Sequence, residues 1–188
     1  MKRLNVRTTD QVVCYETGGM QFFGYRAAWM LHAMGHPNVS VLDGGFPKWA
    51  KEGRACTSTS DSADGFGYKL DTDKIKLLQQ VKDFNANLAE RNYQFLDVRA
   101  PDQFAAGNVE GSTNFPTGKI MDMESKCMKS KEDRIAAFTA AGVDLDKPIT
   151  LSCGAGVAAS VVYMALHDIA TAKVSVYDGS WSEYAKNK

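Results

Sequence analysis

The fold is decided by the stretch Ile149-Thr150-Leu151-Ser152-Cys153-Gly154-Ala155-Gly156-Val157-Ala158-Ala159-Ser160. A short apolar run precedes a cysteine, a turn of small residues and a helical pattern, which predicts a buried strand, a tight loop and a helix. Backbone N–H groups of such a turn, together with the positive end of the following helix, can stabilise negative charge on the sulfur. We therefore interpret Cys153 as a candidate nucleophile. The alternative is an inert cysteine of the core.

A degenerate internal repeat bears on this choice. Residues 39–50 (Val-Ser-Val-Leu-Asp-Gly-Gly-Phe-Pro-Lys-Trp-Ala) align with residues 174–185 (Val-Ser-Val-Tyr-Asp-Gly-Ser-Trp-Ser-Glu-Tyr-Ala), and each copy predicts a strand, a turn and a helix that carries aromatic residues. Upstream, residues 12–16 align with residues 149–153, so that Glu16 stands where the second copy has Cys153. The turn itself does not need a cysteine, and any thiol chemistry belongs to the second copy.

Composition excludes several classes of function. The chain has 188 residues, 44% of them hydrophobic, and equal numbers of acidic and basic residues, so we expect a soluble globular protein with no affinity for nucleic acid. No apolar run is long enough to span a bilayer, and no classical secretory signal is apparent. Cys14, Cys56, Cys127 and Cys153 have neither CxxC nor metal-ligand spacing, which predicts a reducing compartment and no metal.

Short apolar runs alternate with helical patterns, which predicts a parallel α/β fold. We predict a first repeat over residues 1–55, a linker over 56–73 that is rich in Ser, Thr, Asp and Gly, and a second domain over 74–188. A buried strand is expected over 12–15 and a helix over 24–35 with Trp29, Met30 and Met34 on its apolar side. Pro101 and Pro116 are expected in turns. The other predicted strands cover 39–42, 95–98, 149–152 and 174–177, and the other predicted helices cover 74–88, 132–141 and 157–169.

Five short motifs occur in an order that resembles the rhodanese superfamily. They are Leu42-Asp43-Gly44-Gly45, Leu96-Asp97-Val98-Arg99-Ala100, Gly111-Ser112-Thr113-Asn114-Phe115-Pro116, Cys153-Gly154-Ala155-Gly156-Val157 and Tyr177-Asp178-Gly179-Ser180-Trp181. The resemblance is to the two-domain members, among them the 3-mercaptopyruvate sulfurtransferases, and covers residues 12–184. It implies a parallel sheet flanked by helices, with one complete C-terminal domain that carries the active-site cysteine. A partial, non-catalytic rhodanese repeat would precede it.

The resemblance implies a sulfurtransferase that moves a sulfane sulfur from 3-mercaptopyruvate or thiosulfate through a persulfide on Cys153. The acceptor would be cyanide or a thiol, such as thioredoxin or a small thiol, in mitochondria or the cytoplasm and without a cofactor. The N–H groups of Gly154, Ala155, Gly156 and Val157 are the expected persulfide-binding groups. Members that prefer thiosulfate usually have basic residues directly after the cysteine. None is present here, which favours a mercaptopyruvate-like donor.

A cation is needed to bind the carboxylate of that donor. Arg99 follows a predicted central strand, where ligands gather in parallel sheets, and it matches an arginine to which the family assigns substrate binding. The alternative is that Arg99 only pairs with Asp97 or Asp102. Asp97 is expected to be structural, as are Asp43 and Asp178 in the two copies of the turn motif.

The chain also departs from the family pattern. The segment between Arg99 and Gly111 lacks a second arginine, Asn108 replaces a common histidine, and Ala155 and Ala158 replace a serine and a threonine.

The first copy begins at its middle strand, which would expose a parallel sheet edge that invites another chain to pair. The alternative function is therefore a weakly active or inactive structural subunit, with a protein partner that covers the first domain.

A phosphatase activity is not expected for this chain. Phosphatases that use a cysteine need an arginine after five intervening residues, and Ala159 occupies that position here.

Overall fold

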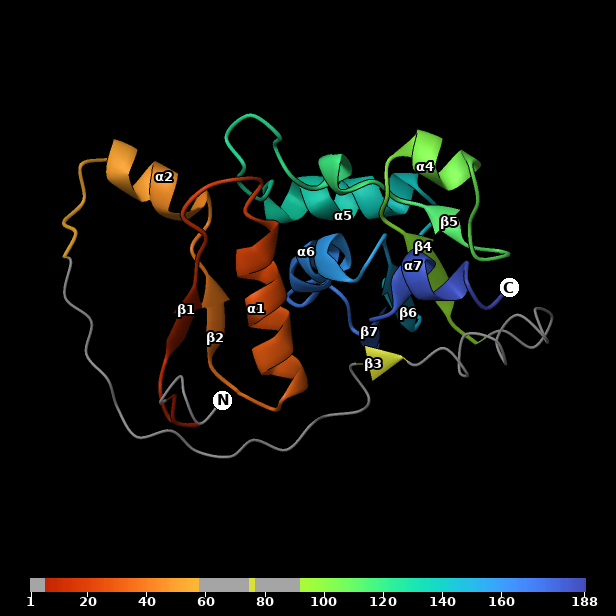
Figure 1. Cartoon of the computed structure of the whole chain (residues 1–188), viewed down its shortest axis with the longest axis horizontal. Helices are drawn as coiled ribbons and strands as arrows, with labels where there is room; N and C mark the ends of the chain where they lie inside the picture. Colours follow the sequence, from red (N-terminus) through yellow and green to blue (C-terminus); the bar gives the residue numbers. More distant parts are fainter. Residues whose placement is uncertain (1–5, 58–74, 77–91) are drawn as a thin grey trace.

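The computed structural model describes residues 6–57, 75–76 and 92–188, and their strands form two separate parallel sheets (Figure 1). The smaller sheet pairs β1 (Val12–Cys14) with β2 (Val39–Val41). The larger sheet, in the order β3-β7-β6-β4-β5, consists of β3 (Ile75–Lys76), β4 (Gln94–Asp97), β5 (Thr113–Asn114), β6 (Ile149–Ser152) and β7 (Val174–Tyr177). Strand β6 is central in this sheet, which explains why all four of its residues are buried.

Helices follow the strands and cover the sheets (Figure 1). They are α1 (Phe22–Ala33), α2 (Gly45–Lys51), α4 (Pro101–Ala105), the 3₁₀ helix η3 (Thr117–Lys119), α5 (Lys131–Ala140), α6 (Val157–Leu166) and α7 (Ser180–Tyr184). Helix α1 lies between the small sheet and α6, with contacts to both. Residues 6–57, termed the first half of the chain, therefore pack through α1 directly against the helix that follows the Cys153 loop.

Helix α1 is apolar on two faces. Tyr25 and Trp29 belong to the main hydrophobic core, together with residues of β4, β6, α5 and α6. Ala28 and Leu31 pack with Cys14 in a smaller cluster at the two-stranded sheet. A helix that is buried on both sides joins the two sheets through side-chain packing rather than through strand pairing.

The predicted elements are largely confirmed. Strands 149–152 and 174–177 coincide with β6 and β7. The predicted strands 12–15, 39–42 and 95–98 and the predicted helices 24–35, 132–141 and 157–169 differ from the observed elements by one to three residues at their ends. The parallel α/β architecture is confirmed as well.

The helix expected over 74–88 is wrong at its beginning. Ile75 and Lys76 form β3, which pairs in parallel with Val176 and Tyr177 of β7. Strand pairing at the sheet edge here overrides the local helical pattern. The remainder of that helix, 77–88, and the greater part of the linker, 58–73, lie outside the described residues. The division into two domains remains a prediction.

Three local expectations also need correction. The strand at residues 12–15 is not buried throughout, because only one face of the small sheet is covered by α1, and Val13 and Tyr15 are 51% and 56% exposed. Met30 is 37% exposed, since it lies one position around the helix from the buried Trp29. Pro101 begins α4 rather than lying in a turn, a position where its missing N–H has no helical partner to lose.

Candidate active site

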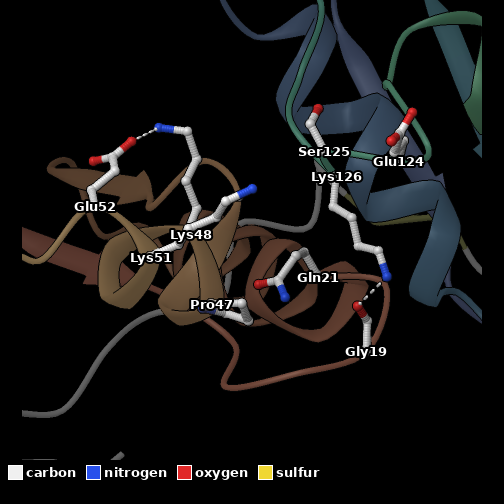
Figure 2. A pocket seen from close by; sticks show the side chains of 10 residues that line it. Gly19, Gln21, Pro47, Lys48, Lys51, Glu52, Glu124, Ser125 and Lys126 are labelled. Carbon is white, nitrogen blue, oxygen red and sulfur yellow. Dashed lines mark hydrogen bonds and ion pairs between the residues drawn. The ribbon is translucent and has the colours of Figure 1, made fainter.

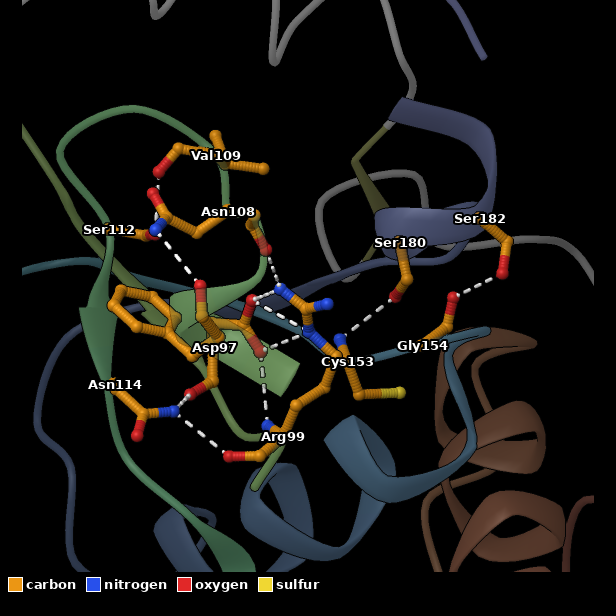
Figure 3. A network of polar contacts seen from close by, with 12 residues as sticks. Asp97, Arg99, Asn108, Val109, Ser112, Asn114, Cys153, Gly154, Ser180 and Ser182 are labelled. Carbon is orange, nitrogen blue, oxygen red and sulfur yellow. Dashed lines mark hydrogen bonds and ion pairs between the residues drawn. The ribbon is translucent and has the colours of Figure 1, made fainter. Parts of the chain in front are cut away.

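The candidate nucleophile lies at the end of the central strand. Cys153 directly follows β6, and α6 begins four residues later at Val157. The thiol is free and the residue is 3% exposed. Figure 3 shows its side chain directed away from the neighbouring pair of Asp97 and Arg99. The structure thus presents Cys153 as the predicted strand-end cysteine, itself buried, at the start of a loop that reaches the surface at Ala155.

Gly156 gives the loop its tight turn. Its φ of +77° is in the left-handed region, which strongly favours glycine. A Cβ atom at this position would lie 2.7 Å from the backbone oxygen of Asp178 and 2.8 Å from Nη1 of Arg26. Gly156 is therefore required both for its backbone conformation and for the close approach of two other segments.

Ser180, at the start of α7, holds the loop from inside. Its fully buried Oγ accepts hydrogen bonds from the backbone N–H groups of Cys153 and Gly156, each at 3.1 Å, and donates to the carbonyl of Tyr177 at 2.8 Å. Ser180 has a φ of +49°, which is uncommon for a residue other than glycine. One hydroxyl therefore fixes both ends of the Cys153 turn.

The first turn of α7 also holds two carbonyl groups of the loop. The N–H of Trp181 donates to the carbonyl of Cys153 at 3.0 Å, and the N–H and Oγ of Ser182 donate to the carbonyl of Gly154 at 2.9 and 2.6 Å. In a trans peptide the next N–H points in the opposite direction to the carbonyl. The N–H groups of Gly154 and Ala155 are thereby turned away from α7, and they have no hydrogen-bond partner within the described ranges.

These contacts narrow the expected set of persulfide-binding amides. The N–H of Gly156 is occupied by Ser180 Oγ and is not available to a ligand. Gly154, Ala155 and Val157 remain candidates, and none of them is fully buried.

Arg99 forms a buried ion pair. Its Nε and Nη2 donate to the Asp97 carboxylate at 2.6–3.0 Å, and its Nη2 also donates to the carbonyl of Gly107 at 2.6 Å (Figure 3). Arg99 is 8% exposed and Asp97 fully buried, and the guanidinium stacks on the Trp181 ring at 4.8 Å. Asn114 donates to the carbonyl of Arg99 at 2.9 Å.

This is the alternative arrangement that the sequence left open for Arg99, with Asp97 as the partner rather than Asp102. These contacts engage Nε and Nη2, whereas Nη1 has no hydrogen-bond partner among the described residues, so the binding of a substrate carboxylate by Arg99 stays a prediction. Trp181, which the repeat indicated only as an aromatic residue of its last helix, contributes to the arrangement by covering Arg99.

The structural roles expected for the other two acids are supported by their contacts. Asp43 Oδ1 accepts from the N–H of Met128 at 2.8 Å and from the Tyr25 hydroxyl at 3.3 Å. Asp178 Oδ1 lies 2.6 Å from Nη1 of Arg26. The acid of each repeat thus connects the first half of the chain to the second.

Sequence reasoning missed Arg26, which lies in the first half of the chain but reaches the Cys153 loop. Its Nη1 also donates to the carbonyl of Gly156 at 3.2 Å. An arginine on a helix of the first repeat gave no local signal of this contact, because 130 residues separate the two partners.

The other cysteines show no comparable setting. Burial raises the pKa of the Cys14 thiol, and burial together with the charge of Asp43 raises the pKa of Cys127. Cys56 is exposed and lies in an irregular segment. Among the described residues, no cluster of His, Cys, Asp and Glu has the arrangement of a metal site, and no helix is long and apolar enough to cross a membrane.

A separate cleft of about 640 Å³ lies between the first half of the chain and the loop that precedes α5 (Figure 2). Its lining includes Lys48, Lys51 and Lys126, but no described residue of the Cys153 loop. Two of these lysines are already engaged, since Lys48 pairs with Glu52 and Lys126 donates to the carbonyl of Gly19. The cleft is therefore distinct from the candidate active site.

The fold and the site together define a parallel α/β domain with a cysteine in a tight loop between its central strand and a helix, as in rhodanese-like domains. The family model for the rhodanese-like domain matches residues 1–52 and 80–187. This chain belongs to the rhodanese-like domain family.

Curated relatives include thiosulfate sulfurtransferase of Gallus gallus, 36% identical over 97% of this chain and 66% of that protein. The 3-mercaptopyruvate sulfurtransferase of Mus musculus is 32% identical over 96% of this chain and 64% of that protein. The thiosulfate/3-mercaptopyruvate sulfurtransferase 1 of Arabidopsis thaliana, named as mitochondrial, is 30% identical over 97% of this chain and 56% of that protein. The chain thus spans two thirds or less of the length of these relatives.

Solved structures agree on the fold. SseA from Escherichia coli, described as a 3-mercaptopyruvate sulfotransferase with the rhodanese fold, has a TM-score of 0.81 and 29% identity, and covers 97% of this chain and 71% of that chain. Tum1 from Saccharomyces cerevisiae has a TM-score of 0.86 and 26% identity, and covers all of this chain and 70% of that chain.

Proposed function

We propose that this chain is a sulfurtransferase that carries a sulfane sulfur as a persulfide on Cys153. The observation that carries the proposal is the loop itself, in which a free cysteine at the end of the central strand is followed by two N–H groups without partners among the described residues. Relatives named as thiosulfate and 3-mercaptopyruvate sulfurtransferases support the same activity.

In the first half-reaction the Cys153 thiolate attacks the outer sulfur of thiosulfate or the thiol sulfur of 3-mercaptopyruvate. With thiosulfate, the S–S bond breaks and sulfite leaves with the bonding electron pair. With 3-mercaptopyruvate, the C–S bond breaks and the enolate of pyruvate leaves, then takes a proton from the thiol of the donor or from water. In both cases a sulfur–sulfur bond forms on Cys153, and a persulfide remains on the enzyme.

In the second half-reaction an acceptor nucleophile takes the outer sulfur. A thiolate, from thioredoxin or a small thiol, or cyanide attacks that atom, and the Cys153 thiolate leaves. The N–H groups of Gly154, Ala155 and Val157 are suited to stabilise the negative charge that alternates between the two sulfur atoms, since they lie at a helix N-terminus.

Two features bear on the donor. The loop lacks the basic residues that would meet a doubly charged thiosulfate, which favours a mercaptopyruvate-like donor. Arg99 pairs with Asp97 through Nε and Nη2, so we propose that it shapes the site through Trp181 and that only its Nη1 is left to meet the carboxylate of a donor. The proposed compartment is the mitochondrion or the cytoplasm, and the name of the Arabidopsis relative supports the former.

A structural subunit remains the second candidate function, and one observation favours it. Val13 and Tyr15 are 51% and 56% exposed at the small sheet, and they line an apolar pocket together with Leu42, Phe46 and Trp49, a surface of the kind that a partner protein would cover. On this alternative the isolated chain would form no persulfide at an appreciable rate.

Intact-mass analysis separates the two candidates. The purified chain is incubated with 3-mercaptopyruvate or with thiosulfate, beside a Cys153→Ser control. The sulfurtransferase proposal predicts one added sulfur atom, absent from the control and discharged by a reducing thiol, and the donor that loads it is identified directly. If neither donor adds sulfur, catalysis by the isolated chain is refuted and the structural alternative is favoured.

A further inference from the structure

We propose that Arg26, on helix α1 of the first half, is a positioning residue for the Cys153 loop in the second half. The inference rests on the proposed function, because it assigns to Arg26 a part in persulfide formation. Arg26 Nη1 lies 2.6 Å from Asp178 Oδ1 and 3.2 Å from the carbonyl oxygen of Gly156. One guanidinium thus bridges the two turns that build the candidate site.

The contact acts on a particular peptide group. The carbonyl of Gly156 and the N–H of Val157 share one plane and point in opposite directions. Arg26 Nη1 and Ser160 Oγ, the latter at 3.0 Å, both donate to that carbonyl. They therefore direct the N–H of Val157 away from Arg26, and this N–H is one of the proposed persulfide donors.

Arg26 completes a pattern in the loop. The carbonyls of Cys153 and Gly154 are held by backbone N–H groups of the first turn of α7. The carbonyl of Gly156 is held by Ser160 of the second half and also by Arg26 of the first half. The three candidate N–H donors are thus each oriented by a carbonyl that accepts a hydrogen bond, and only the last of these carbonyls is contacted from the first half.

The geometry also explains why Arg26 can hold this position. Its guanidinium stacks on the buried ring of Trp29 at 4.4 Å, which restricts the side chain. Its side chain is only 21% exposed, so the hydrogen bonds are partly shielded from water. Gly156 has no Cβ, which would lie 2.8 Å from Nη1. The loop and the arginine are therefore fitted to each other.

The test compares Arg26→Ala and Arg26→Lys with the wild type in the rate of persulfide formation on Cys153. For Arg26→Ala we expect a maximal rate about tenfold lower, the factor for one lost charge-assisted hydrogen bond, with the half-saturating donor concentration unchanged. Arg26→Lys should recover part of the rate, because an ammonium can donate to the same two oxygens. Arg54→Ala is the matched control, since Arg54 also pairs with a carboxylate and stacks on a tryptophan, but lies away from the loop.

Hydrogen exchange of the loop amides gives a second readout that does not depend on activity. The Gly156 N–H is protected by its hydrogen bond to Ser180 Oγ, and Arg26→Ala should accelerate its exchange, whereas Arg54→Ala should leave it unchanged. Wild-type exchange at Gly156 in Arg26→Ala would overturn the inference, as would a wild-type rate of persulfide formation. If the wild type itself forms no persulfide, the proposed function fails, while the exchange measurement still decides whether Arg26 positions the loop.

Discussion

Removal of the Ser180 hydroxyl is the sharpest test of how the loop is built. In Ser180→Ala the buried N–H groups of Cys153 and Gly156 lose their acceptor, and the carbonyl of Tyr177 loses a donor. A buried polar group without a partner costs about 1–3 kcal/mol. With two such donors in one turn, we expect a loss of about 3 kcal/mol in the free energy of unfolding.

For a chain of this size that loss corresponds to a fall in Tm of about 6–12 °C. Ser182→Ala is the matched control, because its exposed hydroxyl also bonds the loop, at the carbonyl of Gly154, but that carbonyl keeps the N–H of Ser182 as a donor. The control should change stability by less than about 0.5 kcal/mol. Both variants are compared by thermal and urea unfolding. Equal losses in the two variants would refute the reasoning that Ser180 holds the turn.

Three further predictions follow from other contacts. Gly156→Ala should lower the free energy of unfolding in urea by about 2 kcal/mol or more, since the new Cβ would lie 2.7 Å from a backbone oxygen at a φ of +77°. Gly154→Ala is the control, because no atom of a described residue beyond its chain neighbours lies within 4 Å of its Cβ, and it should lower that free energy by less than about 1 kcal/mol. Arg99→Met should destabilise the fold by about 3 kcal/mol because it leaves Asp97 as an uncompensated buried charge, and unchanged stability in urea would point instead to a free, substrate-binding arginine. The hydrogen bond from Arg134 lowers the pKa of Asp168, so the stabilisation by this pair is present above the unfolded pKa of about 4 and is lost as the pH falls through the folded value. In Asp168→Asn the difference in unfolding free energy between pH 7 and pH 3 should therefore shrink, by less than about 1 kcal/mol because the Asp168 carboxylate is half-exposed. An unchanged difference would contradict this assignment.

Much of the fold could be predicted because its signals are local. The apolar run 149–152 and the small residues after it predict a buried strand, a turn and a helix wherever they occur, and β6 and α6 begin where expected. The aligned segments 39–50 and 174–185 likewise each contain a strand followed by a helix. The errors fell where pairing decides the outcome, as at Ile75 and Lys76, whose strand forms only because β7 lies beside it.

The candidate site could be predicted only in part. Cys153 and Gly156 were recognisable, since a strand-end cysteine and a glycine at a left-handed turn have local causes. The occupied N–H of Gly156 was not predictable, because its acceptor, Ser180, comes from another turn. The partner of Arg99 was one of two open alternatives, and only the folded chain places its guanidinium on Asp97 and under Trp181.

By itself the sequence determined the parallel α/β class, the position of the candidate nucleophile and the family to which the chain belongs, because these depend on residue order along a few short segments. The tertiary structure alone decided which groups hold the Cys153 loop and which remain free to bind a ligand. Those contacts join residues up to 152 positions apart, as between Arg26 and Asp178. Such pairs leave no periodic trace in the sequence, since they form only when α1 packs beside α6.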